Sequence, residues 1–319
     1  MPHADYQETT TQWHKDLLRD GFAVVKHAVP KERCQYYIEQ MFDWLERFPF
    51  GFDRNDKSTW TEKHLPTHMK GGMYHGYRVQ HEKFVWEARQ EAGVIDAFSK
   101  IWGTNELLAS FDGINFTLPS GSPLPPTAAW PHVDQSPRRT GMQCVQGIIN
   151  FAPNGPEDGG LLVMKGSTRL MEQFFAAHPD VLDRPTWGAT DWFPFEQAEL
   201  DWFKDRGCSI AKVCAGPGDL IVWDSRCMHY NEVPRSQNMR ALIYACYTPA
   251  TLAKPEDLQK KAQLFDQRIG TTHWPHDNIF PIIEKKLRLG KPDLVERDEP
   301  FEHPEETDLV QKLAGKKPY

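Results

Sequence analysis

The segment PGDLIVWDSRCMH, residues 217–229, holds the pattern that decides the fold. Gly218 and Asp219 form a turn signal, an apolar β-branched run begins at Leu220, and His229 lies just past the end of that run. Short apolar runs closed by turn residues are typical of buried strands. The segment therefore predicts a strand whose end presents a histidine at the rim of a β structure.

The same pattern of short apolar runs and turn residues extends over the middle of the chain. Between residues 107 and 249, short strand-like runs are separated by connections rich in proline and glycine, which indicates an all-β sandwich or barrel rather than alternating β and α units. The strands that we expect there are Leu107–Leu118, Met142–Phe151, Gly160–Val163, Ser209–Val213, Asp219–Trp223 and Met239–Tyr247.

Helical periodicity flanks this region on both sides. The elements expected before it are helices over Thr9–Asp20, Lys31–Phe48 and Glu87–Trp102, with a strand over Phe22–Val29. After Pro249 the chain again has helical spacing and then becomes polar, with a lysine-rich end that we expect to fray. One unit therefore accounts for residues 1–319: a helix-rich part over about 9–106, a β core over 107–249 and a helical extension over 250–319.

Composition excludes several classes of protein. The chain has 319 residues, 39% of them hydrophobic, so it can bury roughly 75% of its unfolded surface. Its net charge of -7 opposes binding to a phosphate backbone, and we expect no nucleic-acid partner. The six cysteines form no C-x-x-C pair, and no stretch has the pattern of a signal peptide or a membrane span. We expect a cytoplasmic protein that acts on a small molecule without a membrane, and the oligomeric state stays open.

Four His-x-Asp pairs occur, and their local structure distinguishes them. In a helix, residues two apart point roughly 200° apart and cannot share one ion, whereas in a strand they project from the same face. His132 and Asp134 follow Trp130-Pro131, where an extended backbone is favoured, so this pair has the geometry to chelate a metal. The other pairs lie near the terminus, in a predicted helix or at a predicted helix end: His3/Asp5, His14/Asp16 and His178/Asp180.

His229 is the best candidate for a third ligand. Two histidines and one carboxylate with open positions opposite form the facial triad of non-haem Fe(II) oxygenases. Arg240 begins an otherwise apolar strand, where a guanidinium is costly to bury without an anion. That anion is either a carboxylate of the protein, with Asp219 and Asp224 as candidates, or the carboxylate of a ligand.

The order His132-x-Asp134, His229, Arg240, together with GGLLVMKGST (159–168) and PGDLIVWDSRCMH, resembles the phytanoyl-CoA dioxygenase-like family of Fe(II)/2-oxoglutarate dioxygenases. The resemblance runs from about Leu17 to Pro249. It implies a mainly β fold with flanking helices, built on a double-stranded β-helix, the jelly roll of cupin-like proteins. It also implies that the catalytic iron is held by His132, Asp134 and His229, and that Arg240 binds the distal carboxylate of 2-oxoglutarate.

Further residues follow from the resemblance and from the strand pattern. Asn231 falls where relatives often carry a small hydroxyl residue that contacts the same carboxylate, so Asn231 is the candidate for this contact although it departs from the family pattern. Gln146 and Asn150 share one face of the strand after His132 and are expected to contact the co-substrate. The glycine-rich loop over residues 71–78 could cover the site. Its candidate substrate residues are Tyr74, His75, Tyr77 and Arg78.

The expected reaction consumes O2 and 2-oxoglutarate, releases succinate and CO2, and oxidises a small organic substrate. Hydroxylation is favoured, and desaturation or ring chemistry is open; related halogenases lack the carboxylate that Asp134 supplies. Two alternatives remain: a jelly-roll protein that binds a metal or an anion without turnover, and a metalloenzyme on the same scaffold that does not use 2-oxoglutarate. The substrate itself cannot be derived from the fold.

Overall fold

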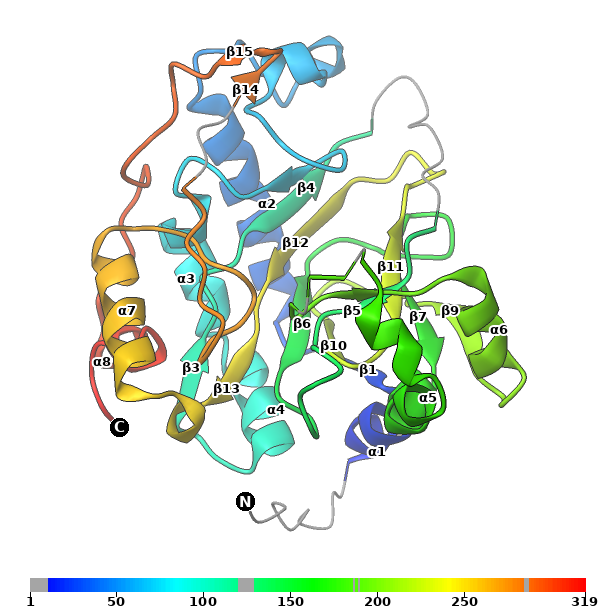
Figure 1. Ribbon diagram of the computed structural model, residues 1–319. Coiled ribbons are helices and arrows are strands. Elements are labelled where there is room, and N and C mark those ends of the chain that lie inside the picture. Colours follow the sequence, from blue (N-terminus) through cyan, green and yellow to red (C-terminus); the bar gives the residue numbers. More distant parts are fainter. Residues whose placement is uncertain (1–10, 120–128, 186, 189, 284–286) are drawn as a thin grey trace.

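Two antiparallel sheets facing each other form the centre of the molecule (Figure 1). The computed structural model describes residues 11–119, 129–185, 187–188, 190–283 and 287–319. Side chains from both sheets meet in one buried cluster, with Leu161 and Val163 from the smaller sheet and Ile148 and Leu242 from the larger. This confirms the expected jelly roll.

The six-stranded sheet has a mixed sequence order because strands from distant parts of the chain pair side by side. In spatial order its strands are β1 (Phe22–Val25), β10 (Leu220–Asp224), β6 (Val145–Asn150), β12 (Arg240–Tyr244), β4 (Ile114–Thr117) and β2 (Met73–Tyr74). The five strands of the second sheet are β8 (Phe193–Pro194), β5 (His132–Val133), β11 (His229–Glu232), β7 (Gly160–Lys165) and β9 (Ser209–Lys212). Two separate pairs are β3 (Leu107–Ala109) with β13 (Tyr247–Pro249), and β14 (Leu287–Arg288) with β15 (Lys291–Pro292).

Helices cover the outer faces of both sheets (Figure 1). On the side of the larger sheet lie α2 (Lys31–Glu46), α3 (Lys83–Arg89), α4 (Ala92–Trp102), α7 (Pro255–Asp266) and α8 (Asp308–Leu313), which share one buried cluster with that sheet. Within this group α4 contacts β13 and α8 contacts β3, and α1 (Gln12–Asp20) packs beside β1. The smaller sheet carries α5 (Met171–Ala177) and α6 (Gln197–Lys204) through an aromatic cluster that includes Phe174 and Phe203. Within the described residues, every helix is too short or too polar to span a bilayer.

Two expected strands, Leu107–Leu118 and Met239–Tyr247, are each divided in two, so these predictions were wrong in their extent. The strand structure is interrupted between β3 and β4, and again between β12 and β13. Ser110 joins the two interruptions, because its amide donates to Cys246 O at 2.9 Å and its hydroxyl accepts from Cys246 N at 3.1 Å. Beyond these interruptions β3 and β13 form a separate pair.

The expected helix over residues 87–102 is also two helices, α3 and α4. The break lies at Gln90 and Glu91, where the Glu91 carboxylate bonds to Arg33 Nε at 2.8 Å and to the Tyr37 hydroxyl of α2 at 2.5 Å. Contacts between distant residues thus interrupt a continuous apolar periodicity, which is why the periodicity alone missed the break.

The C-terminal extension is packed onto the core, and the expectation that its end frays was wrong. The Tyr319 hydroxyl donates to Leu107 O at 2.6 Å, and Val310 and Leu313 of α8 are buried. The segment that follows α7 (orange in Figure 1) returns to the core, where Thr271 N donates to Phe111 O at 2.9 Å. The part of the C-terminal extension beyond α7 therefore packs against the jelly roll.

His276 anchors this segment to the short β3–β13 pair. Its Nδ1 lies 3.0 Å from the Thr248 hydroxyl, and the side chain is buried. Burial lowers the pKa of His276 to about 4, and the nearby carboxylate of Asp277 opposes that shift only in part. The histidine is therefore neutral in the folded protein at neutral pH.

We predict that His276→Gln reduces the pH dependence of stability. Because the pKa of His276 is about 4 in the folded chain and about 6.5 in the unfolded chain, the unfolded state takes up the proton first as pH falls. The free energy of unfolding therefore decreases as pH drops through this window, by on the order of 2 kcal/mol at pH 5 for one such histidine. Urea unfolding of both proteins at pH 7 and pH 5 measures the difference.

His303→Gln is the matched control, because the side chain of His303 is 55% exposed. It should leave the pH dependence as in the wild type. Equal pH dependence in His276→Gln and wild type would contradict the role of His276.

Candidate metal centre

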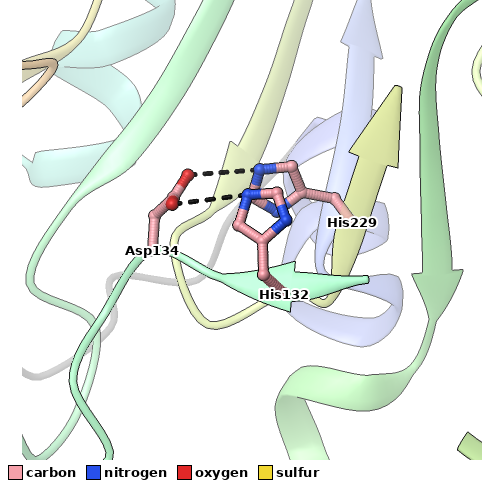
Figure 2. A group of neighbouring side chains, drawn as sticks. All are labelled: His132, Asp134 and His229. Atoms are coloured by element: carbon pink, nitrogen blue, oxygen red, sulfur yellow. Dashed lines mark ion pairs between the residues drawn. The ribbon is translucent and has the colours of Figure 1, made fainter. Parts of the chain in front are cut away.

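His132 and His229 lie directly opposite each other on neighbouring strands. The antiparallel register of β5 and β11 pairs these two residues, and their ring centroids are 4.3 Å apart. Asp134 follows β5 and turns its carboxylate toward both rings (Figure 2). Asp134 Oδ1 lies 3.5 Å from His132 Nε2, and Oδ2 lies 3.2 Å from His229 Nε2.

Backbone carbonyls orient both imidazoles in the same way. His132 Nδ1 lies 3.0 Å from Trp130 O, and His229 Nδ1 lies 3.0 Å from Cys227 O. Since a carbonyl only accepts, each Nδ1 donates to its carbonyl, and each Nε2 is the nitrogen that faces Asp134 and is available to a metal. This carbonyl contact is the arrangement that orients metal-binding histidines in general.

The electrostatics of the three groups also favour a cation. Burial, together with the charge of the neighbouring His229, lowers the pKa of His132 to about 4. Burial alone would raise the pKa of Asp134, but the hydrogen bond and charge of His229, with the charge of His132, hold it well below its ordinary value. At neutral pH the site thus offers neutral nitrogen from His132 and a carboxylate from Asp134.

The donor set fits a metal ion. His132, Asp134 and His229 each offer a ligand atom, and these atoms lie within 4.8 Å of one another. Two imidazoles and one carboxylate form the set that binds Fe(II) with positions left for other ligands. No other group of this kind occurs among the described residues. The sequence therefore identified the components of this site.

Arg240 lies on the inner face of the larger sheet, because it is two residues from Leu242 on β12 and therefore shares its face, and Leu242 belongs to the cluster between the sheets. It is 8% exposed, and its Nε has no hydrogen-bond partner among the described residues. Burial lowers the pKa of Arg240. The guanidinium lies against Gly160, where an added Cβ would be 2.6 Å from Nη2.

The two carboxylates considered as partners of Arg240 are paired elsewhere. Asp219 accepts from Lys26 Nζ at 2.7 Å, and Asp224 accepts from Arg226 Nη2 at 2.7 Å. The alternative of a structural ion pair between Arg240 and one of these residues was therefore wrong. The guanidinium is left as a buried cation that a ligand carboxylate could neutralise.

The three predicted amide residues lie in different surroundings. Asn231 follows His229 on the same face of β11 and is half-buried. Gln146 Nε2 donates to Asp134 Oδ2 at 2.8 Å. Asn150 Nδ2 instead donates to two backbone carbonyls, those of Ala152 and Gly216, at 2.6 and 2.8 Å. Contact of these amides with a co-substrate stays a prediction.

The predicted substrate residues of the glycine-rich loop have different surroundings. Tyr74 is fully buried. The Tyr77 hydroxyl bonds to Asp293, and Arg78 pairs with Asp298 at 3.2 Å, so both contact the C-terminal extension. The ring of His75 lies 6.4 Å from that of Tyr244, which shares the inner face of β12 with Arg240. A substrate role for the four residues stays a prediction.

Three further side chains near the site were not expected from the sequence. The Trp130 ring stacks on His132 at 4.4 Å, and Lys70 Nζ lies 3.8 Å from the centroid of Trp130. His273, in the C-terminal extension, lies close enough to Asp134 to help lower its pKa, and its Nε2 is buried with no partner among the described residues. The Trp-Pro-His sequence could have indicated Trp130, but no local signal connects Lys70 or His273 to the site.

Comparison with known proteins agrees with this geometry. The profile of the phytanoyl-CoA dioxygenase (PhyH) family matches residues 17–242. Ava biosynthesis cluster protein O of Aspergillus versicolor is 43% identical over 273 residues, which cover 85% of this chain and 88% of that protein.

Solved structures of the same fold include the epimerase SnoN in complex with Fe3+, alpha-ketoglutarate and nogalamycin RO. It has a TM-score of 0.51 and 14% identity, and the match covers 75% of this chain and 83% of that chain. EctD from S. alaskensis with bound Fe has a TM-score of 0.51 and 17% identity over 79% of this chain and 80% of that chain. At these identities the likeness supports the fold alone.

We predict that Asp134→Ala abolishes or strongly weakens Fe(II) binding, because it removes one of three ligands and the negative charge of the set. The loss should exceed the ~10–100-fold that removal of an outer contact typically causes. Anaerobic calorimetric titration of the protein with Fe(II) measures the affinity.

Asp180→Ala is the matched control, since Asp180 also belongs to a His-x-Asp pair but lies exposed in a 3-10 turn, Pro179–Asp183. It should bind Fe(II) as the wild type does. Wild-type affinity in Asp134→Ala would refute the site.

Proposed function

The chain belongs to the phytanoyl-CoA dioxygenase family, and from this premise we propose that it is an Fe(II)- and 2-oxoglutarate-dependent oxygenase of a small organic molecule. The observation that carries the proposal is the combination of two features on one inner surface. One is the triad of His132, Asp134 and His229. The other is the buried guanidinium of Arg240, whose Nε has no partner among the described residues.

Each residue of the triad has a definite task. His132 and His229 turn their Nε2 atoms toward the place a metal would take, and Asp134 supplies the negative charge. When bound, Fe(II) supplies the redox chemistry by which 2-oxoglutarate is decarboxylated to succinate and CO2 while O2 oxidises the substrate. Because three ligands come from the protein, positions remain for the co-substrate and for O2.

Arg240 is suited to the distal carboxylate of 2-oxoglutarate. Its planar guanidinium can form two parallel hydrogen bonds to a carboxylate, and burial strengthens such bonds. Gly160 admits the guanidinium close to the backbone of β7, because a Cβ there would be 2.6 Å from Nη2. Gly160 pairs with Glu232, at the opposite end of β11 from His229. The Arg240 guanidinium and the triad therefore lie beside the two ends of the same short strand.

The names of two relatives support a proposal for the class of substrate. The homologue in Aspergillus versicolor bears the name of a biosynthesis cluster, and SnoN was solved with nogalamycin RO. We propose that this chain oxidises a secondary metabolite. Hydroxylation is favoured over desaturation or ring chemistry, and Asp134 argues against halogenation because it fills the position that halogenases leave to chloride.

The first prediction concerns the co-substrate complex. Anaerobic addition of Fe(II) and then 2-oxoglutarate should produce a weak visible charge-transfer band, because the keto acid chelates the metal. The band should be lost in His132→Ala. Succinate, which lacks the keto group, is the control and should give no band.

The outcomes separate the alternatives. If Fe(II) binds but 2-oxoglutarate produces no band, the protein is a metal-binding protein or a metalloenzyme with other chemistry. If Fe(II) itself does not bind to the folded protein, the proposed function is wrong.

The second prediction concerns Arg240→Ala. This substitution should weaken the binding of 2-oxoglutarate by about 10- to 100-fold, since hydrogen bonds to a charged group contribute ~1.5–3 kcal/mol. Titration of the same absorption band measures the dissociation constant, and the affinity for Fe(II) should be unchanged. Arg235→Ala is the control, because Arg235 is exposed and pairs with Glu157 at 2.8 Å. Unchanged 2-oxoglutarate affinity in Arg240→Ala would remove this assignment.

A further inference from the structure

We propose that Gln146 is a positioning residue. Its hydrogen bond to Asp134 restricts this carboxylate to binding the metal through a single oxygen. The inference rests on the proposed iron site and gives Gln146 a role through Asp134 rather than direct contact with the co-substrate. Its basis is the hydrogen bond from Gln146 Nε2 to Asp134 Oδ2 at 2.8 Å. An amide oxygen in that place would face a carboxylate oxygen, so the NH2 group must point there.

The fold fixes the position of Gln146. It is two residues from Ile148 on β6 and shares its face, and Ile148 belongs to the cluster between the sheets, so Gln146 faces the inner surface. In the β6–β10 register it pairs with Trp223, whose ring centroid lies 5.5 Å from that of His229. Gln146 is only 7% exposed. A buried amide with this placement is held by the sheet and cannot move away without losing its hydrogen bond.

The same neighbourhood holds the backbone of Asp134. Asp134 lies beyond the end of β5, and its N donates to Ser225 O at 2.9 Å. Ser225 N donates in turn to Cys144 O at 3.0 Å, on the segment that leads into β6. Gln146 Nε2 also lies 3.4 Å from the Ser225 hydroxyl. The backbone of Asp134 is thus held by Ser225, after β10, and its carboxylate is held by Gln146 of β6.

The chemical consequence concerns the number of open positions on the metal. A carboxylate can bind a metal through one oxygen or two, and rotation of its terminal torsion is soft. The bond from Gln146 occupies a lone pair of Oδ2 and lowers its donor strength, which leaves Oδ1 as the better ligand of Asp134. Without the bond, both oxygens could bind, and one fewer position would remain for the co-substrate and O2.

The test uses Gln146→Met, which keeps the length of the side chain but has no N–H donor, and Gln146→Leu as a second variant. Fe(II) affinity should fall by about 10- to 100-fold, because the Asp134 carboxylate loses the hydrogen bond that orients it toward the metal. The visible spectrum of the Co(II)-substituted protein should also change, because its band intensities depend on coordination number. A change in that spectrum is not expected from a purely structural role.

Gln143→Leu is the matched control, since Gln143 precedes β6 and its amide bonds to Thr140 O near the surface, at 2.8 Å. It should leave both the Fe(II) affinity and the Co(II) spectrum unchanged. Thermal unfolding of each metal-free variant identifies any that fails to fold, and the variant that folds decides the outcome.

Wild-type affinity and a wild-type Co(II) spectrum in a folded Gln146 variant would overturn the inference. So would an equal loss in the Gln143 control. Failure of the wild-type protein to bind Fe(II) would instead refute the proposed function on which the inference rests, so the two failures are distinguishable.

Discussion

The pairing of His132 with His229 across β5 and β11 is the constraint on which the site depends. It brings together residues from distant parts of the chain and sets their rings 4.3 Å apart. Every other feature of the centre is arranged around it: carbonyls two residues back orient both rings, and Asp134 approaches both Nε2 atoms. The register must be fixed for this to work, because a slip by one residue would turn a histidine to the other face. On its other side β11 pairs with β7, where His229 lies opposite the buried Val163, and this pairing keeps the same register.

Two charges of opposite sign lie on the inner surface: the half-buried Asp134 near one end of β11 and the buried Arg240 beside its other end. Each is costly to bury alone. A divalent cation would offset the first, and a dicarboxylate that spans from the metal to Arg240 would offset the second. The proposed ligands therefore stabilise the folded protein as well as react in it, since anything that binds only the folded state does so.

Local rules predicted the parts of the molecule whose geometry is local. The extended backbone after Trp130-Pro131 placed His132 and Asp134 on one face, and the cost of a buried guanidinium indicated Arg240. The breaks within the expected strands and in the helix could not be predicted, because they depend on Ser110 meeting Cys246 and on Glu91 meeting Arg33, which are far apart in sequence. His273 shows the same limit, since only the folding of the extension brings it near Asp134.

Gln146 and Asn150 show why a face is predictable while a role is not. Both carry an amide, both lie on β6, and both face inward, so the pattern treats them alike. Asn150 donates to two backbone carbonyls, whereas Gln146 reaches the carboxylate of a ligand residue. The difference comes from what the opposite elements present at each level of the barrel: the turn before β10 beside Asn150, and the loop after β5 beside Gln146. A side chain's chemistry is set by the group it meets, and that group is chosen by tertiary structure.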